Sequence, residues 1–184
     1  MREEGGYSLV ELIVVMAILG VVIGGLTTVF VQGSRGEIDM NLRFTAQQNA
    51  RSALLQLRTD IHIGCNASVT STTLLIYRFK PDGTCDTVAT TAWCTGTSTN
   101  LSSRLTLWEA SAASCSSPPT GHIFADYIVS GSTLFTLNTP AGGSMQRMSV
   151  TVDLPVNANK AVTSGPVDRY ELKDTIVLRN APQA

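Results

Sequence analysis

The sequence predicts an α+β protein in which a long N-terminal helix packs on a C-terminal antiparallel β-sheet domain. No proline occurs before Pro81, so one helix can run from about Tyr7 to about His62. Apolar residues then recur at helical spacing between Ile38 and Ile61. After Gly64 the pattern changes to short runs of strand-forming residues. The 184 residues suit one anchored domain rather than two.

The first part of this helix, from about residue 9 to about residue 31, is long enough to span a membrane. Residues 12–31 form a run of 20 residues without a charge. At about 1.5 Å per residue the run is about 30 Å long, which matches the hydrocarbon core of a bilayer. The run is too long for an ordinary secretory signal, and no A-x-A-like cleavage site follows it closely. Gly20 and Gly24 form a GxxxG pattern, which allows helices to approach closely in lipid.

The second part of the helix is amphipathic, from about residue 37 to about residue 62. Its apolar face is expected to pack on the following domain and consists of Ile38, Leu42, Ala46, Ala50, Leu54, Leu57 and Ile61. Phe44 and Leu55 fall on the opposite side and are candidates for contact with another subunit. Residues 33–36 contain two glycines and predict a weak turn at the membrane surface. The helix is expected to end near Gly64, a favourable C-cap residue.

The β domain is expected over residues 64–184. Its predicted strands are residues 72–79, 104–109, 122–129, 133–137, 146–154 and 174–179. Between residues 146 and 154, apolar and polar side chains alternate, which gives the strand one buried face. Residues 80–83 and 131–132 carry turn signals. These strands and the apolar helix face predict a single core between helix and sheet.

The four cysteines are expected to form two disulfides. Cys65, Cys85, Cys94 and Cys115 all follow the apolar run, and none belongs to a CxxC pair, so zinc binding and thioredoxin-like chemistry are disfavoured. Four cysteines allow three connectivities. The pairs Cys65–Cys85 and Cys94–Cys115 are favoured because each closes a loop of about twenty residues and the two loops do not cross. Four buried free thiols are the alternative. Trp93 is expected to pack on the disulfide of its neighbour Cys94.

The residues that carry chemistry do not form a catalytic or metal-binding pattern. The histidines are His62 and His122, and no nucleophile, zinc or phosphate-loop motif accompanies them. Asp82 and Asp86 are interpreted as turn residues rather than metal ligands. The 13 basic and 14 acidic residues leave a net charge of −1, which argues against direct nucleic-acid binding. No enzymatic activity, cofactor or metal is predicted.

The N-terminus resembles that of the type IV pilin superfamily. The resemblance is carried by Gly6, the aromatic Tyr7, residues 9–12 (LVEL) and the apolar helix behind them. It implies a leader peptide over residues 1–6, cleavage between Gly6 and Tyr7, N-methylation of Tyr7, and an assembly salt bridge made by Glu11. Tyr7 replaces the usual phenylalanine, and Glu3 and Glu4 make the leader less basic than is typical. Residues 46–55 and 177–180 are similar to W-type minor pilins and J-type minor pseudopilins.

The resemblance also implies a pilin-like fold and a function. The chain is expected to be a structural subunit, a minor pilin or pseudopilin, of a type IV pilus or a related type II secretion or DNA-uptake filament. The expected partners are a prepilin peptidase, other subunits through the N-terminal helix, and membrane lipid before assembly. The expected location is the cytoplasmic membrane, crossed once with the N-terminus inside, and then a cell-surface or periplasmic filament. Residues 33–36 would extend on assembly. The alternatives are a membrane-anchored adhesin, for which Gly6 and Glu11 would have no purpose, and a major pilin.

Overall fold

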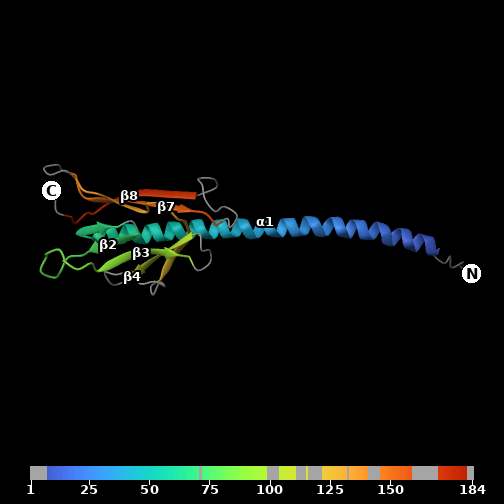
Figure 1. Cartoon of the computed structure of the whole chain (residues 1–184), viewed down its shortest axis with the longest axis horizontal. Coiled ribbons are helices and arrows are strands. Elements are labelled where there is room, and N and C mark those ends of the chain that lie inside the picture. Colours follow the sequence, from blue (N-terminus) through green and yellow to red (C-terminus); the bar gives the residue numbers. More distant parts are fainter. Residues whose placement is uncertain are drawn as a thin grey trace, which may run out of the picture. The chain divides into compact units, whose positions relative to one another are not determined.

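A computed structural model describes residues 8–70, 72–98, 104–110, 115, 122–131, 133–140, 146–158 and 170–181. It confirms the α+β class, with one long helix, α1, and an antiparallel sheet of eight strands among the described residues. The chain divides into two compact units, Met1–Asn41 and Leu42–Ala184. In Figure 1, α1 is coloured from blue to teal, and the strands follow in green, yellow, orange and red.

Helix α1 comprises Leu9–Ile63. It is continuous through residues 33–36, so the weak turn predicted there is wrong. Helical glycines are destabilising by about 1 kcal/mol each, but they do not break a helix when every neighbour favours it. The helix ends one residue before Gly64, as predicted.

All strand pairs are antiparallel, and the strand order is β1-β2-β3-β4-β5-β7-β6 with β8 paired to β7. The six predicted strands are present with shifted ends, and β1 and β3 are additional. The strands are β1 Asn66–Val69, β2 Thr73–Tyr77, β3 Thr91–Thr97, β4 Arg104–Ala110, β5 Ile123–Val129, β6 Phe135–Asn138, β7 Ser149–Val156 and β8 Tyr170–Val177.

The core of the C-terminal unit lies between the sheet and the part of α1 that belongs to this unit. Figure 1 shows this part of α1 flanked by β7 and β8 on one side and by β2, β3 and β4 on the other. The predicted apolar face is confirmed for its buried members Ala46, Ala50, Leu57 and Ile61. Leu42 and Leu54 are partly buried. Ile38 is 59% exposed, so its assignment to the buried face is wrong.

Gly64 is required by close packing rather than by a left-handed backbone. Its φ angle is not positive, in contrast to Gly83 and Gly131 in the turns after β2 and β5. A Cβ atom on Gly64 would lie 2.9 Å from Cγ2 of Ile76. The chain therefore leaves α1 pressed against β2, and a side chain at this position would separate the helix from the sheet.

Both disulfides have the favoured connectivity. Cys65 pairs with Cys85 and Cys94 pairs with Cys115, with Cα–Cα distances of 5.9 and 5.6 Å. The expectation for Trp93 is wrong, because successive residues of a strand point to opposite faces. Trp93 belongs to the main core, whereas Trp108 packs in the cluster that contains Cys94.

Candidate functional site

The start of α1 is the candidate functional site. Ser8 directly precedes the first helical residue, and its carbonyl oxygen accepts backbone N–H groups of Glu11 at 3.0 Å and Leu12 at 3.3 Å. Ser8 is therefore the N-cap residue. Glu11 lies in the first turn and is exposed to solvent. Gly6 and Tyr7, the residues of the predicted cleavage and methylation site, lie outside the described residues.

The sequence around the cap has a second interpretation, which the motif-based analysis missed. Ser8 and Glu11 stand at the S-x-x-E spacing of a capping box, in which the N3 glutamate can satisfy the N-cap backbone N–H. A carboxylate in the first turn also interacts favourably with the helix dipole. Glu11 thus has a local structural role available to it, and any test of an intermolecular role has to separate the two.

The apolar run after Glu11 presents hydrophobic side chains around the whole helix. The exposed fraction of its large side chains lies between 41%, for Val31, and 78%, for Phe30. The two threonines in the run satisfy their hydroxyls within the helix. Thr27 Oγ1 donates to the carbonyl of Ile23 at 2.8 Å, and Thr28 Oγ1 donates to that of Gly25 at 2.7 Å. In hydrocarbon these bonds remove the cost of an unpaired hydroxyl.

Among the described residues, α1 is the one helix whose length and composition would allow it to cross a membrane. Gly20 and Gly24 lie on its open surface, because a Cβ atom at either position would meet nothing within 4 Å. Both glycines therefore leave space for a neighbouring helix. The pilin-like N-terminal motif noted from the sequence and this apolar helix together indicate membrane anchoring.

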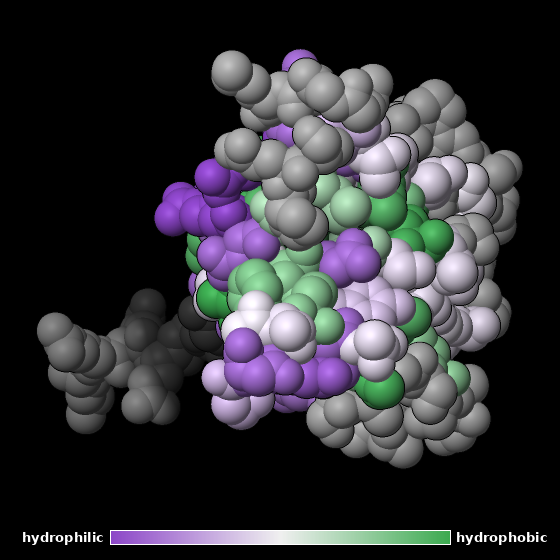
Figure 2. Space-filling model, turned by 90° about the vertical axis from the view of Figure 1, so that its left-hand side faces the viewer, coloured by the Kyte–Doolittle hydropathy of each residue, from purple (hydrophilic) through white to green (hydrophobic). Residues whose placement is uncertain are grey.

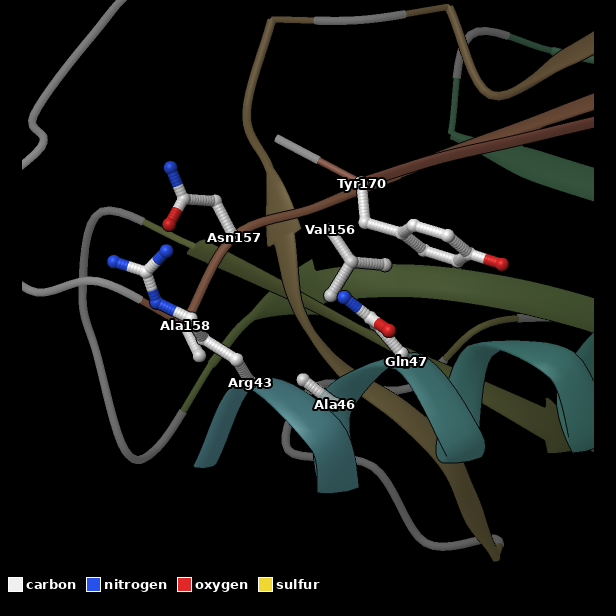
Figure 3. A pocket seen from close by; sticks show the side chains of 7 residues that line it. All are labelled: Arg43, Ala46, Gln47, Val156, Asn157, Ala158 and Tyr170. Atoms are coloured by element: carbon white, nitrogen blue, oxygen red, sulfur yellow. The ribbon is translucent and has the colours of Figure 1, made fainter. Parts of the chain in front are cut away.

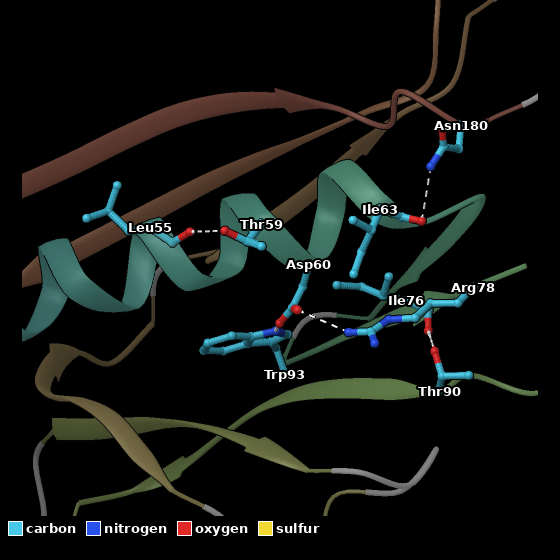
Figure 4. A network of polar contacts seen from close by, with 9 residues as sticks. All are labelled: Leu55, Thr59, Asp60, Ile63, Ile76, Arg78, Thr90, Trp93 and Asn180. Carbon is cyan, nitrogen blue, oxygen red and sulfur yellow. Dashed lines mark hydrogen bonds and ion pairs between the residues drawn. The ribbon is translucent and has the colours of Figure 1, made fainter.

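A polar network lies beneath the last turns of α1, within the C-terminal unit (Figure 4). Asp60 is 3% exposed. Its carboxylate accepts a hydrogen bond from Trp93 Nε1 at 3.0 Å and one from Arg78 Nη2 at 3.2 Å. Burial raises the pKa of the Asp60 carboxyl group against the opposing effect of these two partners. Burial and the nearby Asp60 likewise raise the pKa of Glu109, which faces Trp93 across β3 and β4.

The raised pKa of Asp60 predicts a stability that falls as pH rises. The folded state holds a proton on Asp60 at pH values where the unfolded chain, with an ordinary pKa of 3.8, has lost it. The stabilisation is complete below pH 3.8 and is lost as pH rises through the folded-state pKa. The expected slope is at most about 1.4 kcal/mol per pH unit for one proton.

Urea unfolding at a series of pH values, on wild type and the Asp60→Asn variant, measures this contribution. The wild type should lose stability relative to the variant as pH rises above about 4, and the difference should become constant above the raised pKa. The comparison with asparagine removes the titration of the carboxylates that do not interact with Asp60, and the measured difference therefore belongs to Asp60 together with Glu109, whose pKa Asp60 raises. Parallel curves for the two proteins would contradict a raised pKa at Asp60.

The remaining acidic candidates are turn residues, as predicted. The Asp82 carboxylate accepts hydrogen bonds from the backbone N–H and the hydroxyl of Thr84, at 2.8 and 2.6 Å. These bonds lower the pKa of Asp82. Asp86 accepts from the N–H of Val88 at 3.1 Å and lies 3.8 Å from Lys80 Nζ. Across the part of the chain that the structure describes, no group of three His, Cys, Asp or Glu side chains could hold a metal ion.

A cavity of about 250 Å³ lies at the edge of the C-terminal unit. Figure 3 shows Arg43, Ala46 and Gln47 of α1 on one side and the end of β7 with the start of β8 on the other. Arg51 on α1 binds Tyr170 on β8, because its guanidinium donates two hydrogen bonds to the Tyr170 hydroxyl, at 2.8 and 3.0 Å. The described lining contains no histidine, cysteine or carboxylate side chain, so it does not supply an acid–base pair.

The comparisons with known proteins point to the N-terminus. A family model described as a prokaryotic N-terminal methylation motif matches residues 1–27. No curated protein and no solved structure matches the chain. The match covers Gly6, Tyr7 and residues 9–12, which carry the resemblance to type IV pilins, but not residues 46–55 and 177–180, and it supports a pilin-type or pseudopilin-type substrate of prepilin peptidase. The chain carries the N-terminal methylation motif of type IV pilin-like proteins, at the start of the helix that leads into a disulfide-linked antiparallel β domain.

Proposed function

We propose that this chain is a minor pilin or pseudopilin, a structural and non-enzymatic subunit of a type IV pilus or a related type II secretion or DNA-uptake filament. The observation that carries the proposal is the methylation motif over residues 1–27, placed at the beginning of a helix whose residues 12–31 carry no charge. A leader peptide alone would not require such a helix, and an anchor alone would not require the motif.

The proposed assembly chemistry takes place at three residues. Prepilin peptidase cleaves after Gly6 and exposes the amine of Tyr7, which is then N-methylated. The methylated amine keeps its positive charge and pairs with Glu11 of a neighbouring subunit inside the apolar filament core. The pair offsets the burial of both charges, whereas one charge left without the other costs about 3–5 kcal/mol. Gly20 and Gly24 allow the helices to approach closely around it.

The proposed location changes during assembly. The subunit first crosses the cytoplasmic membrane once, with its N-terminus inside and the β domain outside, and then enters a cell-surface or periplasmic filament. The two disulfides support an external β domain, because disulfides persist in oxidising compartments. Leaving the membrane is favourable only if other subunits cover the exposed apolar run.

Intact-mass measurement and N-terminal sequencing of the protein from its native membrane or filament fraction test this proposal. The expected chain begins at a methylated Tyr7, and its mass lacks the hydrogen atoms removed by both disulfides. A chain that still begins at Met1 in cells with an active prepilin peptidase would contradict the proposal and favour a simple anchored surface protein. Low abundance relative to the main subunit in purified filaments is expected for a minor pilin, and high abundance would identify a major pilin.

A further inference from the structure

The outer edge of β8 combines unpaired backbone groups with basic side chains. In the described part of the chain, β8 pairs with β7 alone. The backbone N–H of Leu178 donates to Met148, so alternate residues of this strand point toward β7. The intervening residues Lys173, Thr175 and Val177 therefore direct their N–H and C=O groups away from β7.

One of these outward groups already has a partner, and that partner lies on α1. His62 Nδ1 is 2.9 Å from the carbonyl oxygen of Val177 and donates its proton, because a carbonyl can only accept. This contact marks the end of the free edge. The N–H and C=O of Thr175 have no hydrogen-bond partner among the described residues, and they are available to an added strand.

A groove of about 450 Å³ runs along this edge, between β8 and the side of α1 that carries Arg58 and His62. Arg58 donates to the Asp174 carboxylate at 2.5 Å and holds one wall of the groove to the other. Leu55, one turn before Arg58 on the same side of α1, is 62% exposed. A segment lying on the edge would direct alternate side chains toward these α1 residues.

The charge of the groove determines which segment fits. The lining contains the basic residues Arg58, His62 and Arg179 and one acid, Asp174, which is bound to Arg58. Beyond the lining, Arg147 and Lys173 are exposed, as is the acid Glu171 on β8, and Asp153 on β7 is the cross-strand partner of Lys173. With His62 neutral, the lining has a charge of +1, on a chain whose net charge is −1. Figure 2 shows the end of the domain, where hydrophobic side chains lie in small areas between hydrophilic ones.

We propose that this groove binds an extended, acidic segment of a partner polypeptide, which adds to the sheet as a strand beside β8 with its carboxylates toward Arg58, His62 and Arg179. Backbone hydrogen bonds to Thr175 supply affinity, and the alternate carboxylates supply specificity. The groove lining described here has no phenylalanine, tyrosine or tryptophan side chain on which a nucleobase could stack.

The test measures fluorescence anisotropy with the full-length protein in detergent micelles. The probe is a labelled peptide of about eight residues that alternates valine and glutamate, and the matched peptide replaces glutamate by lysine. Saturable binding of the acidic peptide, weakened by added salt, is expected for the wild type, with binding of the lysine peptide at least about tenfold weaker. An oligothymidylate of similar length serves as the polyanion control.

Two variants make the test specific to this edge. Thr175→Pro removes the outward N–H and leaves the backbone hydrogen bonds to β7 in place, and it should weaken peptide binding by about tenfold. Thr175→Val loses the same hydroxyl contact with Thr151 on β7 but keeps the outward N–H, so it should bind as the wild type does. Arg179→Glu should weaken binding without removing any backbone donor. Equal binding by the wild type, Thr175→Pro and Arg179→Glu would overturn the proposal. So would absent binding to the wild type, or oligothymidylate binding as tight as that of the acidic peptide. None of these results depends on filament assembly.

Discussion

Replacing Cys65 and Cys85 together by alanine is expected to lower the free energy of unfolding of the C-terminal unit by about 3 kcal/mol. The bond closes a loop with a sequence separation of 20, and the lost cross-link increases the conformational entropy of the unfolded chain. Cys65 is fully buried directly after α1, so this disulfide holds the exit from the helix to the segment after β2. The variant should also show a larger urea m-value, because its unfolded state is more expanded.

The second disulfide is the matched control. Cys94 and Cys115 have a separation of 21, so the entropic loss in the Cys94→Ala, Cys115→Ala variant should also be about 3 kcal/mol. Urea unfolding of the full chain in detergent can be followed by tryptophan fluorescence, since Trp93 and Trp108 are at most 1% exposed. A loss below about 1 kcal/mol in both variants would contradict stabilisation through the unfolded state.

The periodic elements could be predicted from the sequence, because their signals are local. The uncharged run and the absence of proline before Pro81 were sufficient for α1. Loop lengths favoured the disulfide pairing that the structure shows, but the sequence alone could not choose it among the three connectivities. Strand ends were less accurate. β7 continues to Val156 through Pro155. The proline nitrogen points away from β8, and β6 has already ended at this position, so no N–H is needed there for a hydrogen bond between strands.

The two strands that were missed lack a strand-like sequence. β1 has four residues, NASV, and β3 contains Gly96 among small and polar residues. Gly96 is required by the tertiary structure, since a Cβ atom there would lie 2.8 Å from the ring of Trp108 on β4. That contact joins residues far apart in the sequence, and no local propensity reveals it.

The polar core residue Asp60 shows the same limit. A helical-face analysis treats aspartate as a solvent-facing residue, but the partner that permits its burial, Trp93, is 33 residues away. The candidate site at the N-terminus was predictable for the opposite reason. Its motif occupies consecutive residues, and the S-x-x-E spacing of Ser8 and Glu11 is local in the same way, whereas the helical hydrogen bonds of Thr27 and Thr28 became evident only from geometry.

Replacing Glu11 by leucine is expected to leave folding and export intact but to reduce filament incorporation by at least about tenfold. In the proposed assembly, leucine would leave the amine of a neighbouring Tyr7 buried without its counter-charge. Incorporation is the ratio of the variant in sheared filaments to the variant in the membrane fraction, normalised to wild type. Formation of both disulfides, measured by thiol titration, reports that the β domain has still been exported.

Glu11→Gln separates the assembly role from helix capping. Glutamine at the N3 position can still serve a capping box with Ser8, but it carries no charge. If the charge pair drives assembly, glutamine and leucine should impair incorporation alike, because both leave the amine unpaired. If Glu11 acts through the cap alone, glutamine should restore incorporation. Normal incorporation of the leucine variant would remove Glu11 from the assembly mechanism altogether. The charge on one side chain in the first turn of α1 therefore decides between an intermolecular and a purely local role for the motif.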